Sequence, residues 1–144
     1  IEVQLPFLQY VYGAEKVRLV LISMLRQDLA VSQPLGQAIA SALQDKAGVI
    51  IASSDFSHYE PQSSASKKDR LALDAILDMD PEQLETIVER HNISMCGPGP
   101  VMTMLIASKL LGAKKARLLK YATSGDITGD HSQVVAYASV EVTM

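Results

Sequence analysis

The residues best suited to chemistry follow a short apolar run in the first half of the chain. The run Gly48-Val49-Ile50-Ile51-Ala52 leads directly into Ser53-Ser54-Asp55-Phe56-Ser57-His58-Tyr59. This second stretch offers a carboxylate, hydroxyls, an imidazole and a phenol within a few residues. In open α/β sheets ligands bind beyond the carboxyl ends of strands, so Asp55 and His58 are candidate site residues. The structural alternative is a loop whose Ser and Asp side chains cap the next helix.

The single cysteine, Cys96, is the second candidate. It lies in a stretch broken by two Gly and two Pro, just before residues 101–111, which we predict to form an apolar, buried helix. A helix N-terminus favours the thiolate form of a cysteine. Together with His58 and Asp55, the thiolate could bind a soft or borderline divalent metal. Cys96 and His58 could instead form a nucleophile–base pair, or Cys96 could simply fill the core.

The other two histidines are weaker candidates. The sequence contains neither a His pair at i, i+4 spacing nor a Cys-x-x-Cys pair, which are the strong metal-site patterns. His91 ends a predicted helix, where a cation is favourable, and His131 lies in a polar loop.

The elements that must position these residues alternate between helix and strand, which predicts an α/β fold. We predict strands over 17–24 and 48–52, joined by a helix that Ser32 caps, that has Pro34 in its first turn and that ends near Lys46. Further helices are expected after a cap at Ser64 or Ser66 and after Asp80-Pro81. The remaining elements are an initial helix stopped at Gly13 and strands over 116–122 and 133–142.

Composition is that of an ordinary globular domain. The 144 residues are 48% hydrophobic and 20% charged, so one domain over 1–144 with a real core is expected. A net charge of −3 gives no electrostatic footprint for nucleic acid. No apolar run has the roughly 18 residues of a membrane span, and one cysteine fits a reducing, cytoplasmic setting.

Three stretches together resemble the Memo family. They are Ser53 to Tyr59, the stretch Asn92-Ile93-Ser94-Met95-Cys96-Gly97, and Tyr121-Ala122-Thr123-Ser124-Gly125-Asp126; the opening Ile1-Glu2-Val3-Gln4-Leu5-Pro6-Phe7 also matches. The resemblance implies a sheet flanked by helices, like that of the class III extradiol dioxygenases. It also implies metal binding, by iron or copper, with a redox-related role and, in bacteria and archaea, a radical SAM companion protein.

Carried over by residue, Cys96 matches a metal ligand of the family, and Asp55 and His58 match the pocket beside it. The family's remaining ligands are histidines in motifs resembling Pro-His-Ala-Gly and Ser-His-His, which this chain lacks. The chain therefore resembles the C-terminal half of a Memo domain. We accordingly expect weak or absent metal occupancy in this chain, and either self-association or pairing with a missing N-terminal half.

Four functions stay open at this point. The first is a Memo-like metal-site protein that is a possible non-haem metal-dependent oxidoreductase. The second-ranked alternative is a non-catalytic partner-binding module with a vestigial pocket. A thiol enzyme is the third. A ring-cleaving dioxygenase comes last, because spacing does not show whether Glu2 or Asp55 would supply the carboxylate of a two-His-one-carboxylate site.

Overall fold

The fold is built on a small antiparallel sheet of three strands. The computed structural model describes residues 2–144, so Ile1 of the opening match lies outside the described residues. The strand order is β1-β3-β2, with β3 (Val134–Thr143) between β1 (His58–Glu60) and β2 (Lys115–Thr123). Both pairings are antiparallel. The α/β class predicted from the sequence is confirmed, and the two C-terminal strands lie where they were expected.

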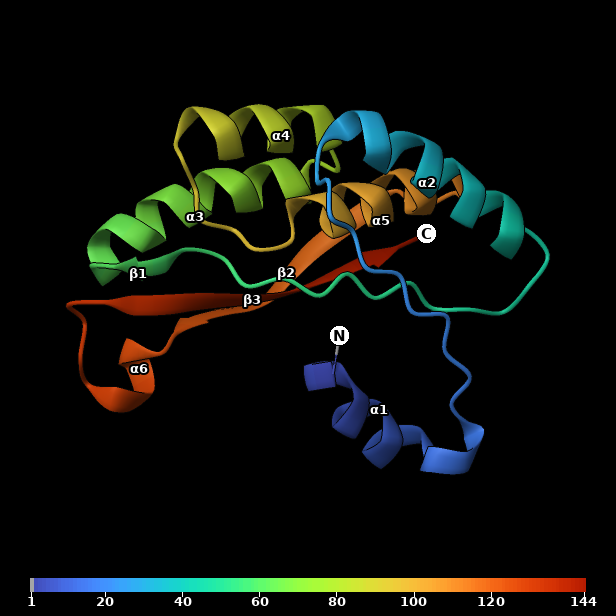
Figure 1. Ribbon diagram of the computed structural model, residues 1–144, viewed down its shortest axis with the longest axis horizontal. Helices are drawn as coiled ribbons and strands as arrows, with labels where there is room; N and C mark the ends of the chain where they lie inside the picture. The colour runs from blue at the N-terminus through green and yellow to red at the C-terminus, as the bar shows by residue number, and fades with distance from the viewer. Residues whose placement is uncertain (1) are drawn as a thin grey trace.

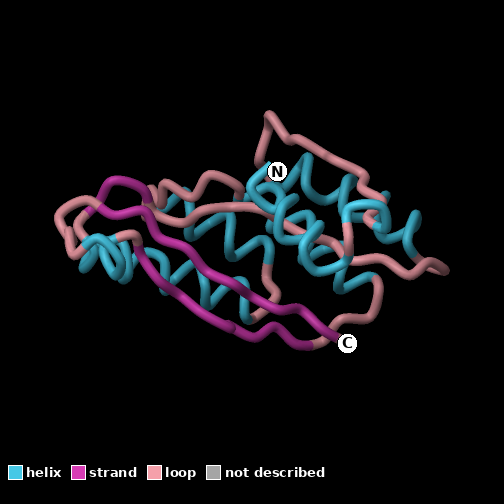
Figure 2. The backbone as a smooth tube through the Cα atoms, turned by 90° about the horizontal axis from the view of Figure 1, so that it is seen from below, coloured by secondary structure: helices cyan, strands magenta, loops and turns pink. Residues whose placement is uncertain are grey.

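Four helices form a layer over one face of this sheet (Figure 1). They are α2 (Leu29–Leu43), α3 (Gln62–Leu77), α4 (Pro81–Arg90) and α5 (Pro98–Leu110). The short α6 (Gly125–Thr128) lies in the β2–β3 connection. Helix α1 (Leu5–Tyr12), flanked by 3-10 turns at Glu2–Gln4 and Ala14–Lys16, stands apart from the layer. Figure 2 shows the same arrangement from below, with the two long strands running side by side.

The core lies between the helical layer and β3. Its fully enclosed side chains include Leu84 of α4 and Met102 and Leu105 of α5, which pack with Leu73 of α3 and Ala136 of β3. Alternation along β3 turns Val134 and Ala136 inward, as its period of two predicts. No helix within residues 2–144 is long and apolar enough to cross a membrane.

The predicted strands over 17–24 and 48–52, and the βαβ unit they would form, are wrong. Both segments are irregular in the structure, and neither joins a ladder. A strand needs a neighbour for its N–H and C=O groups, and an apolar run supplies none by itself. Several side chains of these segments are exposed, including Val20 (89%) and Val49 (80%). Residues 49–52 and β3 instead border a common cavity of about 530 Å³.

Two predicted helix caps are also wrong. Asp28 rather than Ser32 caps α2, because its carboxylate accepts a hydrogen bond from Val31 N (3.0 Å), and Pro34 lies inside the helix. Helix α3 begins after Pro61 without a side-chain cap, so neither Ser64 nor Ser66 has that role. The predicted helix start at Asp80-Pro81 and the stop at Gly13 are confirmed, and Asp80 caps α4 by accepting from Gln83 N (2.9 Å).

Candidate metal centre

Asp55, His58 and Cys96 converge, although 38 to 41 residues separate the cysteine from the other two. One potential ligand atom from each residue lies within 4.8 Å of the others. His58 Nε2 is 3.7 Å from Asp55 Oδ2. Within residues 2–144 no other group of three metal-capable side chains lies as close together. The residues singled out in the sequence therefore share one place in the fold.

The loop that carries Asp55 is held against β3. Phe56 N donates to Ala136 O (2.9 Å), and Ala136 N donates to Ser57 O (3.0 Å). The predicted loop over 53–59 therefore ends early, because His58 already begins β1 and pairs with Val135. Anchoring to a sheet holds a side chain more precisely than a free loop does, which suits a site residue.

The imidazole of His58 has a defined tautomer. Its Nδ1 lies 2.6 Å from the backbone oxygen of Ser94, and a carbonyl oxygen only accepts hydrogen bonds. Nδ1 must therefore carry the proton, which in the neutral ring leaves a lone pair on Nε2. Metal-ligating histidines commonly donate their second ring N–H to such a carbonyl. The contact prepares Nε2 to act as a ligand.

Backbone contacts hold Cys96 against the Asp55 loop. Asp55 N donates to Cys96 Sγ (3.1 Å), and Cys96 N donates to Asp55 O (3.3 Å). Gly97 N donates to Ser54 Oγ (2.9 Å). A Cβ on Gly97 would lie 2.8 Å from Ser53 O, so only glycine permits this close approach. As predicted, the cysteine precedes the first turn of a helix, here α5.

The electrostatics of the cluster favour a cation. The lone pair of His58 Nε2 and the carboxylate of Asp55 face each other, and both carry negative potential. Cys96 Sγ adds a third donor that is negative when the thiol ionises. A proton or a metal ion between these atoms relieves their repulsion. The set of sulfur, imidazole and carboxylate ligands fits a soft or borderline ion such as copper, zinc or iron better than magnesium or calcium.

The other histidines lie outside the cluster. His91 is exposed at the end of α4. His131 is exposed near the β2–β3 connection, where its Nδ1 contacts Gln62 Oε1. Neither residue belongs to the group of three.

Several supporting residues were not predicted from the sequence. Ser94 holds His58 through its carbonyl and also through Oγ, which accepts from His58 N (2.7 Å). Gln27 bridges the turn around Cys96, because Nε2 donates to Cys96 O (3.0 Å) and Oε1 accepts from Gly99 N (3.3 Å). These are single polar residues in irregular segments, and only the positions of distant backbone atoms give them a role.

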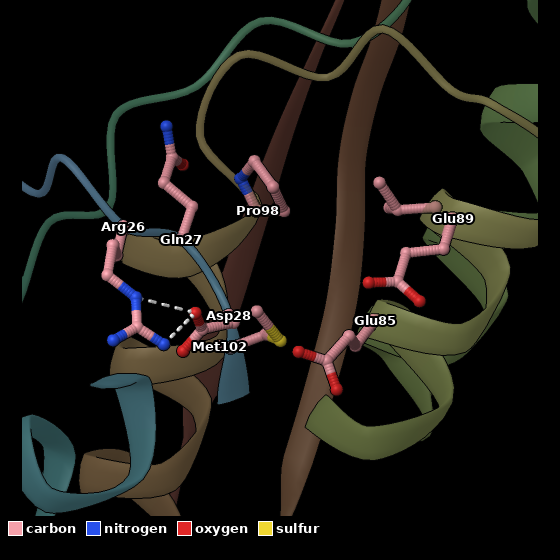
Figure 3. Close-up of a pocket in the computed structure, with 8 residues that line it drawn as sticks. Arg26, Gln27, Asp28, Glu85, Glu89, Pro98 and Met102 are labelled. Atoms are coloured by element: carbon pink, nitrogen blue, oxygen red, sulfur yellow. Dashed lines mark hydrogen bonds and ion pairs between the residues drawn. The ribbon is translucent and has the colours of Figure 1, made fainter. Parts of the chain in front are cut away.

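Gln27 and Pro98, the first residue of α5, also line a cavity of about 370 Å³ (Figure 3). Arg26 and Asp28 face each other there in an ion pair of 2.7 Å. Glu85 accepts from Leu29 N (2.6 Å), so it serves the start of α2. These contacts give Arg26, Asp28 and Glu85 structural partners, and no residue of the metal-capable cluster lines this cavity.

Comparison with known proteins places the chain in a family. The family model described as Memo-like protein matches residues 1–141. The chain belongs to the Memo-like family, and the resemblance found in its motifs is confirmed.

Curated relatives are described as MEMO1 family proteins. A MEMO1 family protein of Methanopyrus kandleri is 51% identical over 142 residues, which are 97% of this chain and 50% of that protein. A MEMO1 family protein of Methanocaldococcus jannaschii is 51% identical over 146 residues, covering 99% of this chain and 51% of that protein. One of Desulfurococcus amylolyticus is 46% identical, covering 98% and 50%. The chain thus spans about half the length of the curated relatives it matches.

Proposed function

We propose that Asp55, His58 and Cys96 form a transition-metal site of a Memo-family protein, with iron or copper as the ion. The observation that carries this proposal is the convergence of three different donor atoms within 4.8 Å. The carbonyl of Ser94, which leaves His58 Nε2 free, supports it further. When bound, iron or copper would supply one-electron redox chemistry. The chain's own part is to hold the ion and fix its ligands.

The wider assignment rests on family membership. We propose that the intact protein has a pocket like that of the class III extradiol dioxygenases, and is a possible non-haem metal-dependent oxidoreductase. A radical SAM companion protein and a cytoplasmic location are parts of the same proposal. The longer relatives have room for further ligands, since this chain covers about half of each. Binding by the three donors alone should therefore be the weaker case.

An anaerobic titration with iron(II) or copper(I) tests the metal site. We expect measurable but weak binding to this chain, and at least a 10-fold loss of affinity in Cys96→Ser and in His58→Ala. His91→Ala, which removes an exposed histidine outside the cluster, is the matched control and should bind as the parent does. The equivalent cysteine substitution in a longer MEMO1 family protein repeats the comparison at higher affinity. Unchanged affinity in Cys96→Ser would refute the proposal.

The surface favours one second function, a partner-binding module. Helix α1 has no buried residue, and Phe7, Tyr10 and Val11 are 68%, 91% and 68% exposed. Large apolar side chains grouped on one helix are typical of interaction surfaces. We propose that a second copy of the chain, or the remaining part of a family domain, packs against this surface and covers the 530 Å³ cavity. Partner binding that survives replacement of Asp55, His58 and Cys96 would favour this function over the metal site.

A further inference from the structure

A fully buried carboxylate, that of Asp69, is hydrogen-bonded to Ser57, the neighbour of His58. Asp69 of α3 has no exposed surface. Its Oδ1 accepts from Ser57 Oγ (2.7 Å) and from Ser57 N (3.1 Å), and its Oδ2 accepts from Tyr121 OH (2.7 Å). Burial raises the pKa of this carboxyl, and the hydrogen bonds from Ser57 and Tyr121 oppose that rise. Three donors converge on two oxygens, so the group is built to act as an acceptor.

Burying a carboxylate costs free energy even when hydrogen bonds offset part of that cost. An apolar side chain could fill the same space at the core without hydrogen-bonding demands. The partners of Asp69 show where its effect goes, because two of its three hydrogen bonds end on Ser57. Ser57 is the residue immediately before His58.

The hydrogen bonds of Ser57 and of His58 follow one another without a break. Asp69 holds Ser57 from the helical side, while Ala136 of β3 holds the carbonyl of Ser57 (3.0 Å). The next residue, His58, contacts Ser94 through both its backbone N–H and its ring. A displacement of Ser57 would therefore move the backbone of His58, and with it the imidazole ring, relative to Ser94.

We propose that Asp69 is a positioning residue for the metal site, which fixes Ser57 and thereby aims His58 Nε2 toward Asp55 and Cys96. This inference rests on the proposed metal function for its importance. The geometry it describes exists without a metal, however, so it can be measured separately. The competing explanation is that Asp69 only braces α3 against β2 through Tyr121.

Two substitutions separate these explanations, because they remove hydrogen bonds of the same length from opposite oxygens. Ser57→Ala removes the 2.7 Å bond to Oδ1 on the site side. Tyr121→Phe removes the 2.7 Å bond to Oδ2 on the β2 side. Asp69→Ala removes all three bonds, and Asp74→Ala on the same helix, which loses an ion pair with Arg70 at the surface, is its control.

The first readout is the tautomer of His58, measured by long-range ¹H–¹⁵N NMR of the metal-free protein. In the parent we expect the Nδ1–H tautomer to dominate in the neutral ring. Ser57→Ala and Asp69→Ala should show a mixture of tautomers, while Tyr121→Phe and Asp74→Ala should match the parent. The second readout is cobalt(II) affinity, which should fall about 10-fold in Ser57→Ala and change less than about 3-fold in Tyr121→Phe.

The outcomes decide between positioning and bracing. Equal changes in Ser57→Ala and Tyr121→Phe, or a parent-like His58 spectrum in Asp69→Ala, which removes both bonds to Ser57, would overturn the positioning role. If Asp69→Ala fails to fold, the contrast between Ser57→Ala and Tyr121→Phe decides the matter. If the parent binds no cobalt(II) while the tautomer shift appears as expected, the metal function fails and the positioning of His58 stands.

Discussion

His58 Nδ1 lies 2.6 Å from the backbone oxygen of Ser94, while Ser94 Oγ accepts from His58 N at 2.7 Å. One residue thus holds both the backbone and the ring of the histidine. The two contacts join β1 to the stretch that leads into α5, so the two halves of the candidate metal site are connected directly. The hydrogen bond from Nδ1 sets the tautomer of the ring. The bond from His58 N to Ser94 Oγ fixes the backbone position from which the ring extends.

Replacing Ser94 by alanine separates these two contacts. The carbonyl remains, but His58 N loses its acceptor, and an unmade hydrogen bond of this kind costs about 1 kcal/mol of stability. We expect that loss in chemical denaturation, together with a metal affinity lowered by a few fold. Ser139→Ala, at an exposed position of β3, should change neither quantity. Full metal affinity in Ser94→Ala would show that the Oγ contact does not matter to the site.

Gly97→Ala should disturb the site without touching a ligand. The added Cβ would lie 2.8 Å from Ser53 O and 2.9 Å from Ser54 Cβ, so the Cys96 turn must move away from the Asp55 loop. Weaker metal binding and slower formation of the metal–thiolate absorption band are expected. Gly48→Ala is the control, because its Cβ would meet only the end of the flexible Leu43 side chain at 3.0 Å. Equal affinity in both variants would contradict the close packing of the two loops.

The ion pair between Lys68 and Glu60 predicts a pH-dependent stability. Lys68 Nζ lies 2.8 Å from Glu60 Oε1, and this hydrogen bond holds the pKa of Glu60 below its usual 4.5. A carboxylate with a lowered pKa stabilises the folded state above its unfolded pKa, and that contribution is lost as the pH falls through the folded value. Lys68→Met should therefore lower the free energy of unfolding by about 0.5–1 kcal/mol at pH 7.

The difference between Lys68→Met and the parent should shrink as the pH falls below 4.5, because Glu60 becomes protonated in both. Urea denaturation at several pH values measures it. Lys67→Met, at the exposed neighbouring position, should show no such trend. A difference that grows on acidification would mean that Glu60 is not the partner of Lys68.

The exposed apolar side chains predict self-association. Tyr10, Val20 and Leu25 are 91%, 89% and 99% exposed, and residues 17–24 have no ladder partner in the structure. We expect size-exclusion chromatography with light scattering to show a mass above that of one 15.6 kDa chain. Polar substitutions at Tyr10 and Val20 should shift the protein toward the monomer. A stable monomer at high concentration would contradict the proposed packing surface.

The comparison of sequence and structure shows which patterns carry information. Two patterns predicted their elements correctly: the alternation over 133–142 and the helix start at Asp80-Pro81. Each depends on contacts within the segment itself or with a sequence neighbour. The runs 17–24 and 48–52 were misread as strands, because pairing depends on a partner that hydrophobicity does not reveal. The pairing of His58 with Cys96 came from the family resemblance, because the strand predicted before His58 is absent from the structure. Ser94 and Asp69 escaped notice because their importance comes from atoms 36 and 12 residues away.

The most direct test of the metal site is X-ray absorption spectroscopy of the protein loaded with iron(II) or copper(I). The three converging donors predict one sulfur neighbour at roughly 2.3 Å, typical of metal–thiolate bonds, together with imidazole scattering. In Cys96→Ser the sulfur signal should disappear, and in His58→Ala the imidazole signal should weaken. A spectrum with only oxygen and nitrogen neighbours that is the same in the parent and in Cys96→Ser would contradict the proposed site.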